Sequence, residues 1–198
     1  MTKPFQINIL LFDEVEVLDF AGPFEVFSLA AQPDGKKCFQ VCTVAQERKT
    51  LRARGGLLVT PACTFADAPP ADALIVPGGY GAEEIERYNP VVVAQVRAQY
   101  RQANTVIASV CTGAFILAEA GLLDGKSATT HWMDLDRLSS EYPAIQVKRD
   151  VKFVDEGRVL TSGGIAAGIH MALHLVSRWA GMDIARSTAR RMEYDMPF

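Results

Sequence analysis

One cysteine stands where a buried strand is predicted to pass directly into a helix. Cys111 follows the apolar run from 105 to 110, and a helical segment from 113 to 121 begins almost at once. A residue in such an elbow presents its side chain at the carboxyl edge of the sheet. Because a helix N-terminus favours an anion, we expect a thiol pKa below the usual ~8.5 and a nucleophilic thiolate. The alternative is a small cysteine that only packs the strand end.

A second strand end offers backbone groups for charge that develops when a nucleophile adds to carbon. The apolar strand from 73 breaks at Pro77, and Gly78 and Gly79 follow. We expect this strand beside the elbow strand, where glycines let the backbone approach a ligand closely. The N–H groups of Gly79 and Thr112 are the predicted oxyanion donors. Alternatively, the two glycines only make a tight turn.

The histidines are further candidates. His131 lies twenty residues after Cys111 and is a possible general base. His170 and His174 stand four residues apart, a spacing that suits a metal, but they lack the glutamate that a zincin uses as its base. We therefore interpret them as a packed or surface pair and predict no metal site.

The composition favours a single domain that acts on a small molecule. The chain has 198 residues, 49% of them hydrophobic, and a formal net charge of −3. This is enough apolar material for one core, and the charge offers no basic surplus for nucleic acid. No segment approaches the ~20 apolar residues of a membrane span, and the N-terminus lacks a signal-peptide pattern. We therefore expect one cytoplasmic domain over residues 1–198, with no nucleic-acid or membrane partner.

The cysteines are expected to be free thiols. An intracellular chain with this apolar content does not need covalent cross-links. Cys38, Cys42 and Cys63 are interpreted as small buried hydrophobic residues. Cys38 and Cys42 have no second pair at zinc spacing, which again argues against a metal.

Short apolar runs alternate with helical patterns, which predicts a mostly parallel sheet covered by helices. Strands are expected at 7–12, 39–44, 73–79 and 105–110, with a short strand inside 54–64 and a hairpin around 155–157. Helices are expected at 22–31, 90–103, 113–121, 163–181 and 183–194. The pattern contains neither a linker nor a repeat.

Four segments, in this order, resemble the ThiJ/PfpI superfamily, which has the glutamine-amidotransferase-like fold. They are LFDEVEVLDFAGPFEVF (11–27), VPGGYG (76–81), SVCTGAFILAEAGLLDGKSATTHW (109–132) and LTSGGIAAGIHMAL (160–173). The resemblance implies a flavodoxin-like three-layer α/β sandwich with a nucleophile elbow. Within the superfamily, the chain is most similar to the isonitrile hydratases and to the ligand domains of AraC-type regulators.

The resemblance also implies roles for individual residues. Cys111 is then the nucleophile, Asp19 the acid/base carboxylate and Thr112 a hydrogen-bonding neighbour. A further group is expected to bind the oxyanion or the substrate: Gly78, Gly79, Gly164 and His131.

The chain departs from the commoner superfamily pattern in two places. Much of the superfamily has a glutamate near the position of Asp19 and a histidine directly after the cysteine, where this chain has Thr112. This argues against the protease-like and glyoxal-processing branches. Glu14 and Glu16 are rival acids, although solvated loop charges are the simpler interpretation.

The implied activity is that of a hydro-lyase that adds water to an isonitrile, through a thioimidate on Cys111, and releases an N-substituted formamide. Neither a metal nor an organic cofactor is expected. One alternative is a hydrolase or glyoxalase acting on amides or reactive carbonyls. Another is a stand-alone ligand- or redox-sensing domain; AraC-type regulators continue into a helix-turn-helix region, whereas this chain ends at Phe198. A homodimer is expected from the resemblance alone.

Overall fold

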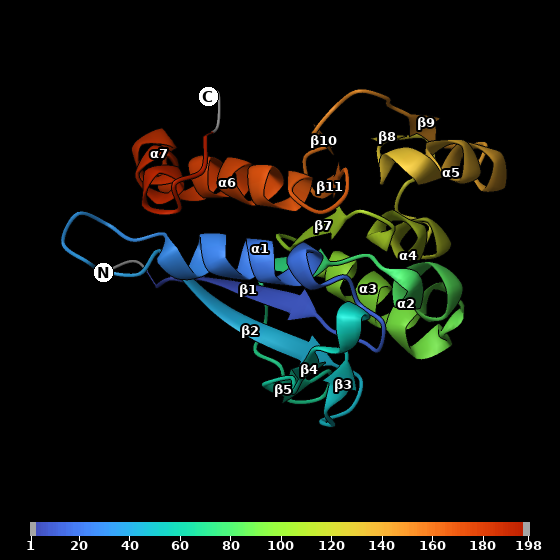
Figure 1. Ribbon diagram of the computed structural model, residues 1–198, viewed down its shortest axis with the longest axis horizontal. Helices are drawn as coiled ribbons and strands as arrows, with labels where there is room; N and C mark the ends of the chain where they lie inside the picture. The colour runs from blue at the N-terminus through green and yellow to red at the C-terminus, as the bar shows by residue number, and fades with distance from the viewer. Residues whose placement is uncertain (1–2, 196–198) are drawn as a thin grey trace.

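A mostly parallel sheet runs through the computed structural model, which describes residues 3–195 (Figure 1). Its seven strands have the order β10-β11-β7-β6-β1-β2-β5. They are β1 (Phe5–Leu10), β2 (Phe39–Ala45), β5 (Cys63–Thr64), β6 (Ala73–Val76), β7 (Val106–Val110), β10 (Phe153–Asp155) and β11 (Val159–Ser162). The β10–β11 hairpin is antiparallel, and the other pairs are parallel. The predicted strands are thus confirmed.

Helices cover both faces of the sheet, as the three-layer prediction requires. The helices α1 (Val17–Leu29), α6 (Ala167–Ala180) and α7 (Met182–Arg191) pack together on one side. On the other side, α3 (Pro90–Arg101) and α4 (Gly113–Glu119) pack together, with the short α2 (Tyr80–Glu84) against α4. Figure 1 shows α6 and α7 running above α1, away from α2, α3 and α4.

The alternation of side chains along β1 explains these two layers. Phe5 stacks on Trp179 of α6, with 5.3 Å between the ring centroids. Leu10 points to the opposite face and lies near Val92 and Val96 of α3. Because both faces of β1 are covered, its two polar side chains are buried as well, and Nε2 of Gln6 donates to Oδ1 of Asn8 at 3.0 Å.

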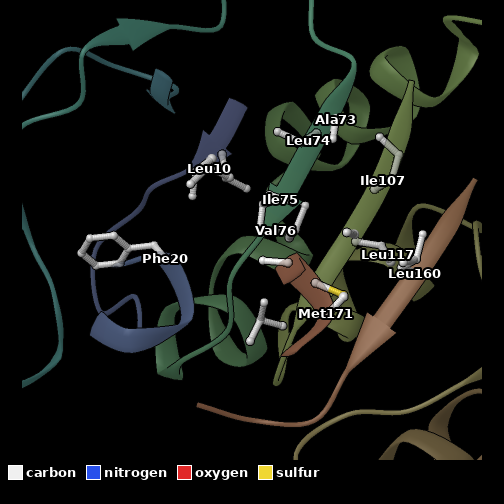
Figure 2. Packing of buried hydrophobic residues seen from close by; sticks show 14 of the residues in the cluster. Leu10, Phe20, Ala73, Leu74, Ile75, Val76, Ile107, Leu117, Leu160 and Met171 are labelled. Carbon is white, nitrogen blue, oxygen red and sulfur yellow. The ribbon is translucent and has the colours of Figure 1, made fainter. Parts of the chain in front are cut away.

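The centre of the core lies between β6, β7, β11 and α6. Ile75, Ile107 and Leu160 come from three neighbouring strands, and each has no exposed surface. Figure 2 shows these side chains with Met171 of α6 beside the strands. This rigid centre ends where β6 and β7 reach the loops that hold Gly78 and Cys111.

Smaller elements surround the sheet. One hairpin pairs β3 (Leu51–Arg52) with β4 (Leu58–Val59), and a separate parallel pair joins β8 (Ser127–Ala128) to β9 (Gln146–Val147). Helix α5 (Leu135–Glu141) packs against β9. The sequence patterns did not predict α2, α5, β8 or β9, which are short. Among residues 3–195, no helix combines the length and the apolar character that crossing a membrane requires.

The first helix begins five residues earlier than predicted. The expected helix begins at Gly22, but α1 already begins at Val17. Pro23 only removes the N–H that would bond to the Asp19 carbonyl. Gly22 is needed for close packing, since a Cβ there would lie 2.8 Å from Cγ1 of Ile169 in α6. The early start puts Asp19 in the first turn of α1.

Candidate active site

Cys111 occupies a sharp elbow between β7 and α4, as predicted. Its φ angle is +55°, a left-handed conformation that is strained for a residue with a Cβ. Its N–H donates to the carbonyls of Ser162 and Gly163, both at 3.2 Å. Gly113 begins the helix two residues later. The backbone of the neighbouring strand end therefore holds the elbow in this conformation.

The elbow is also held by close contact with the end of β6. A Cβ on Gly78 would lie 2.6 Å from the Thr112 nitrogen and 2.8 Å from Cβ of Cys111. A Cβ on Gly113 would lie 2.2 Å from the Val76 carbonyl oxygen. Both positions require glycine, because the two strand ends meet backbone to backbone. The predicted adjacency of these strands is confirmed.

Asp19 lies against this elbow and has no exposed surface. Its Oδ2 accepts a hydrogen bond from the Gly78 N–H at 3.1 Å, and its Oδ1 accepts one from the Ile165 N–H at 3.0 Å. The Gly78 amide joins the carboxyl to the elbow, since a Cβ on Gly78 would lie 2.8 Å from Cβ of Cys111. Burial raises the pKa of Asp19 to about 7, although the two backbone hydrogen bonds act in the opposite direction. Asp19 therefore exchanges its proton near neutral pH.

The predicted lowering of the Cys111 pKa is wrong for this structure. The side chain is 7% exposed, and burial, followed by the negative charge of Asp19, raises the pKa of the thiol. The Thr112 N–H lowers it, but less. Helix α4 has only seven residues, so its dipole is small compared with these two effects. The thiol therefore keeps its proton near neutral pH.

The Gly79 amide faces Thr112. Its N–H donates to Oγ1 of Thr112 at 2.9 Å, and the Gly78 N–H is already bonded to Asp19. The Thr112 N–H favours negative charge on the Cys111 sulfur, since it lowers the pKa of the thiol. An oxyanion role for Gly79 stays a prediction, and it requires the Thr112 hydroxyl to turn away.

Gly164 separates Cys111 from His131. A Cβ on Gly164 would lie 3.2 Å from the Cys111 sulfur and 2.3 Å from Cδ2 of His131. His131 Nδ1 lies 3.5 Å from Oδ2 of Asp134 and accepts a hydrogen bond from the Met133 N–H at 3.4 Å. Glycine at this position thus leaves space between the thiol and the imidazole, and the Met133 N–H orients the ring.

A cleft of about 450 Å³ opens over the elbow. Four predicted site residues line it: Gly79, Cys111, Thr112 and His131. The rest of the lining was not among the predicted site residues: Glu16, Arg54, Glu83, Met133, Asp134 and Ile165. Three of these side chains are acidic, and Arg54 adds a positive charge 3.6 Å from Glu16. Asp19 lies beneath this lining.

The lining residues that sequence reasoning missed come from short elements and loops. Arg54 lies in the turn between β3 and β4, Glu83 in α2, and Asp134 in a 3₁₀ turn after His131. The position of Asp134, three residues after His131, was a weak indication that its carboxylate would lie near the imidazole. Glu16, interpreted as a solvated loop charge, instead lines the cleft, whereas Glu14 lies outside the lining.

The other histidines lie away from the cleft. His174 Nε2 is 2.7 Å from Oδ2 of Asp155, and the rings of His170 and His174 both pack on Phe153. This agrees with the predicted packed pair. Among the residues described, no group of three or more His, Cys, Asp and Glu side chains is arranged to hold a metal.

Known proteins are similar to this chain over nearly its whole length. The chain is 41% identical over 189 residues to an isonitrile hydratase from Pseudomonas putida. This match covers 96% of the chain and 78% of that protein. It is 31% identical over 193 residues to the HTH-type transcriptional regulator GbdR from Pseudomonas aeruginosa, covering 98% of the chain but only 52% of the regulator.

Solved structures show the same architecture. A THiJ/PfpI family protein from Pseudomonas syringae superposes with a TM-score of 0.85 at 28% identity, over 99% of this chain and 78% of that one. Drosophila melanogaster DJ-1beta superposes with a TM-score of 0.84 at 19% identity, over 98% of this chain and all of that one. The DJ-1/PfpI family model matches residues 5–178. This chain therefore belongs to the DJ-1/PfpI family.

Proposed function

We propose that this chain is an isonitrile hydratase-like enzyme, a cysteine-dependent hydro-lyase that converts an isonitrile and water into an N-substituted formamide. The observation that carries the proposal is a buried carboxyl held at the Cys111 elbow: Asp19 accepts a hydrogen bond from the Gly78 N–H, Gly78 packs against Cys111, and the pKa of Asp19 is about 7. Together they supply a nucleophile and a proton beside an open cleft. The 41% identity to a named isonitrile hydratase supports the same chemistry.

The first step is addition of the thiol to the terminal isonitrile carbon. Asp19 accepts the Cys111 proton, and the sulfur forms a bond to the carbon. Asp19 then returns the proton to the same carbon, which gives a thioimidate, R–N=CH–S–Cys. Asp19 lies beneath the cleft lining. We therefore propose that it delivers the proton to the isonitrile carbon from the floor of the cleft, next to the sulfur.

The second step is hydration of the thioimidate. Water adds to the carbon while Asp19 accepts one of its protons and passes that proton to the nitrogen, which gives R–NH–CH(OH)–S–Cys. The C–S bond then breaks and the sulfur leaves with the electron pair, while Asp19 takes the hydroxyl proton and returns it to the sulfur, and the formamide R–NH–CHO is released. The sum is one isonitrile plus one water, and both side chains return to their starting states.

Neighbouring groups support the charged states along this path. The Thr112 N–H lowers the pKa of the Cys111 thiol, so we assign it to stabilising the thiolate as it forms. His131 lines the cleft with its ring oriented by the Met133 N–H, so we assign it to positioning the water. Gly164 keeps the space above the sulfur open.

A panel of alkyl and aryl isonitriles tests the proposal. We expect the reduced protein to release the matching formamide, and intact-mass analysis after acid quenching to detect one substrate equivalent on Cys111. Methylglyoxal belongs in the same panel, because lactate release would identify the glyoxalase alternative. If no isonitrile gives formamide, or if the adduct lies on another residue, the proposal fails.

A second candidate function is ligand sensing without turnover. It is favoured by the match to GbdR, in which this chain corresponds to about half of a transcriptional regulator. The measurement that separates the two is calorimetry with a non-reactive isostere of the best substrate, combined with turnover assays. Saturable binding with no product from any isonitrile would favour the sensor.

We also propose that the chain forms a homodimer, as the family resemblance implies. The exposed apolar side chains of Leu18 and Phe24 on α1 support this, because their exposed fractions are 37% and 38%. Light scattering should give about twice the mass of the chain, and a monomeric mass at micromolar concentration would contradict it.

A further inference from the structure

A second pair of reactive side chains lies at the edge of the sheet, away from the cleft. The sulfurs of Cys42 in β2 and Cys63 in β5 are 2.9 Å apart. This is within about 1 Å of the ~2.05 Å length of a disulfide bond. Both cysteines are free thiols here, so two unbonded sulfurs are held almost at bonding distance.

The strand register explains why they meet. Val44 pairs with Cys63 in the parallel β2–β5 ladder. Cys42 lies two residues before Val44, so its side chain points to the same face of the sheet, diagonally across from Cys63. β5 is an edge strand of two residues, and it can adjust by the small distance that a bond requires.

The two thiols differ in access. Cys42 is 9% exposed, whereas Cys63 is half-buried and more accessible to solvent. Burial and the neighbouring Cys63 raise the pKa of Cys42 to about 12, so Cys42 keeps its proton near neutral pH. Cys63 is thus the thiol positioned to meet a solvent oxidant first.

We propose that Cys42 and Cys63 are a modification site that forms a reversible disulfide with a peroxide, separately from Cys111. The Cys63 sulfur attacks one peroxide oxygen, an S–O bond forms, the O–O bond breaks, and water leaves. The Cys42 sulfur then attacks the Cys63 sulfur, an S–S bond forms, the S–O bond breaks, and a second water leaves. Two thiols are oxidised by two electrons in total, and one hydrogen peroxide is reduced.

The bond would close a covalent loop around part of the cleft rim. The segment between the two cysteines contains β3, β4 and the turn that holds Arg54. The Arg54 N–H donates to the Val15 carbonyl at 3.0 Å, and its side chain lines the cleft. A loop of this size constrains the unfolded chain, so oxidation is expected to raise Tm by about 5 °C.

The test uses the full chain with Cys38→Ser and Cys111→Ser, which leaves only the pair. After treatment with hydrogen peroxide, we expect the intact mass to fall by ~2 Da, one Cys42–Cys63 linked peptide after digestion, and recovery with dithiothreitol. The matched control adds Cys63→Ser, which removes the partner and must abolish both the mass loss and the Tm shift.

Two results would overturn the proposal. One is that both thiols still react with iodoacetamide in denaturant after peroxide treatment. The other is that oxygen adducts accumulate without any linked peptide, because a resolving thiol at 2.9 Å should capture the sulfenic acid first.

Discussion

The two sulfur sites of this molecule have similar burial and different partners. Cys111 and Cys42 are both buried, and burial raises the pKa of each thiol. The thiol of Cys111 has its pKa raised by the nearby Asp19, whose own pKa is about 7, whereas Cys42 contacts a second thiol. A carboxyl partner exchanges protons, and a thiol partner exchanges electrons. The neighbouring group, more than the cysteine's own exposure, therefore decides which chemistry each site is suited to.

The sites also differ in how firmly the backbone holds them. Cys111 follows a strand in the middle of the sheet, and Gly78 and Gly113 pack against its elbow with no space for a side chain. Cys63 belongs to a two-residue strand at the sheet edge. Addition to a substrate needs a fixed nucleophile, while disulfide formation needs a small movement. Each position suits its proposed reaction.

The largest expected effect separates the two sulfurs directly. Cys111→Ala removes the nucleophile and should lower kcat/KM for an isonitrile by at least ~10⁴-fold. Cys42→Ala, a matched loss of one buried thiol, should stay within about twofold of the parent, because it leaves the elbow untouched. Initial rates of formamide release measure both. Comparable losses in the two variants would refute the division of roles.

The next effect concerns the partner of Cys111. Asp19→Asn keeps the size of the side chain but removes the proton acceptor, and kcat/KM should fall by ~10²–10⁴-fold. In the parent, kcat/KM should rise with pH through an apparent pKa of about 7, because the thiol loses its proton only to an ionised Asp19. The variant should lose this limb of the pH profile. An unchanged limb would show that another group titrates.

The raised pKa of Asp19 also predicts how the free energy of unfolding depends on pH. Its pKa rises from 3.8 to about 7 on folding, so between these values the folded chain keeps a proton that the unfolded chain releases. The free energy of unfolding should therefore fall as pH rises, by up to about 4 kcal/mol for this group. Urea unfolding from pH 4 to 8 measures the slope, and Asp19→Asn should flatten it. A parent slope no steeper than that of the variant would contradict the assignment.

The fold and the elbow were predictable because their signals are local. The apolar run before Pro77 ends at a residue that cannot continue a central strand, and the pattern that follows Cys111 is helical. The predicted start of α1 at Gly22 was five residues late, and the need for glycine at this position arises from contact with α6, which no local pattern contains.

The chemistry of the site depended on contacts that no local pattern contains. The family resemblance indicated Asp19, which is 92 positions from Cys111 in the chain. The thiol pKa was predicted in the wrong direction because burial and the charge of Asp19 are tertiary effects. The Cys42–Cys63 contact depends on the register of a two-residue edge strand, and two residues are too few for a periodic signal.

A smaller effect tests how closely the cleft surrounds the sulfur. In Gly164→Ala, the new Cβ would lie 3.2 Å from the Cys111 sulfur and would displace His131, so kcat/KM should fall by ~10–100-fold. Gly163→Ala is the control, since its Cβ would meet its nearest neighbour at an acceptable 3.4 Å. Steady-state kinetics and thermal unfolding should show a loss of rate at similar Tm. Equal rates in both variants would mean that the space above the sulfur is not used.

The smallest expected effect concerns the charge around Cys111. Glu83 lines the cleft, and burial and the charge of Asp134 raise its pKa. Glu83 also lies 3.6 Å from Arg137, which retains Glu84 and Glu141 as partners if Glu83 is neutralised. An acidic cleft should disfavour isonitriles that carry a carboxylate, compared with neutral ones of similar size.

Glu83→Gln should therefore raise kcat/KM for a carboxylate-bearing isonitrile about fivefold relative to a neutral one, and added salt should reduce the difference. Glu84→Gln is the matched control, because Glu84 bonds to the same Arg137 at 2.7 Å but lies outside the cleft lining. If both variants changed the ratio equally, the effect would come from Arg137. If neither changed it, the acidic side chains would not select the substrate, and Cys111 would differ from Cys42 through Asp19 and its rigidly packed elbow rather than through the charge of the cleft.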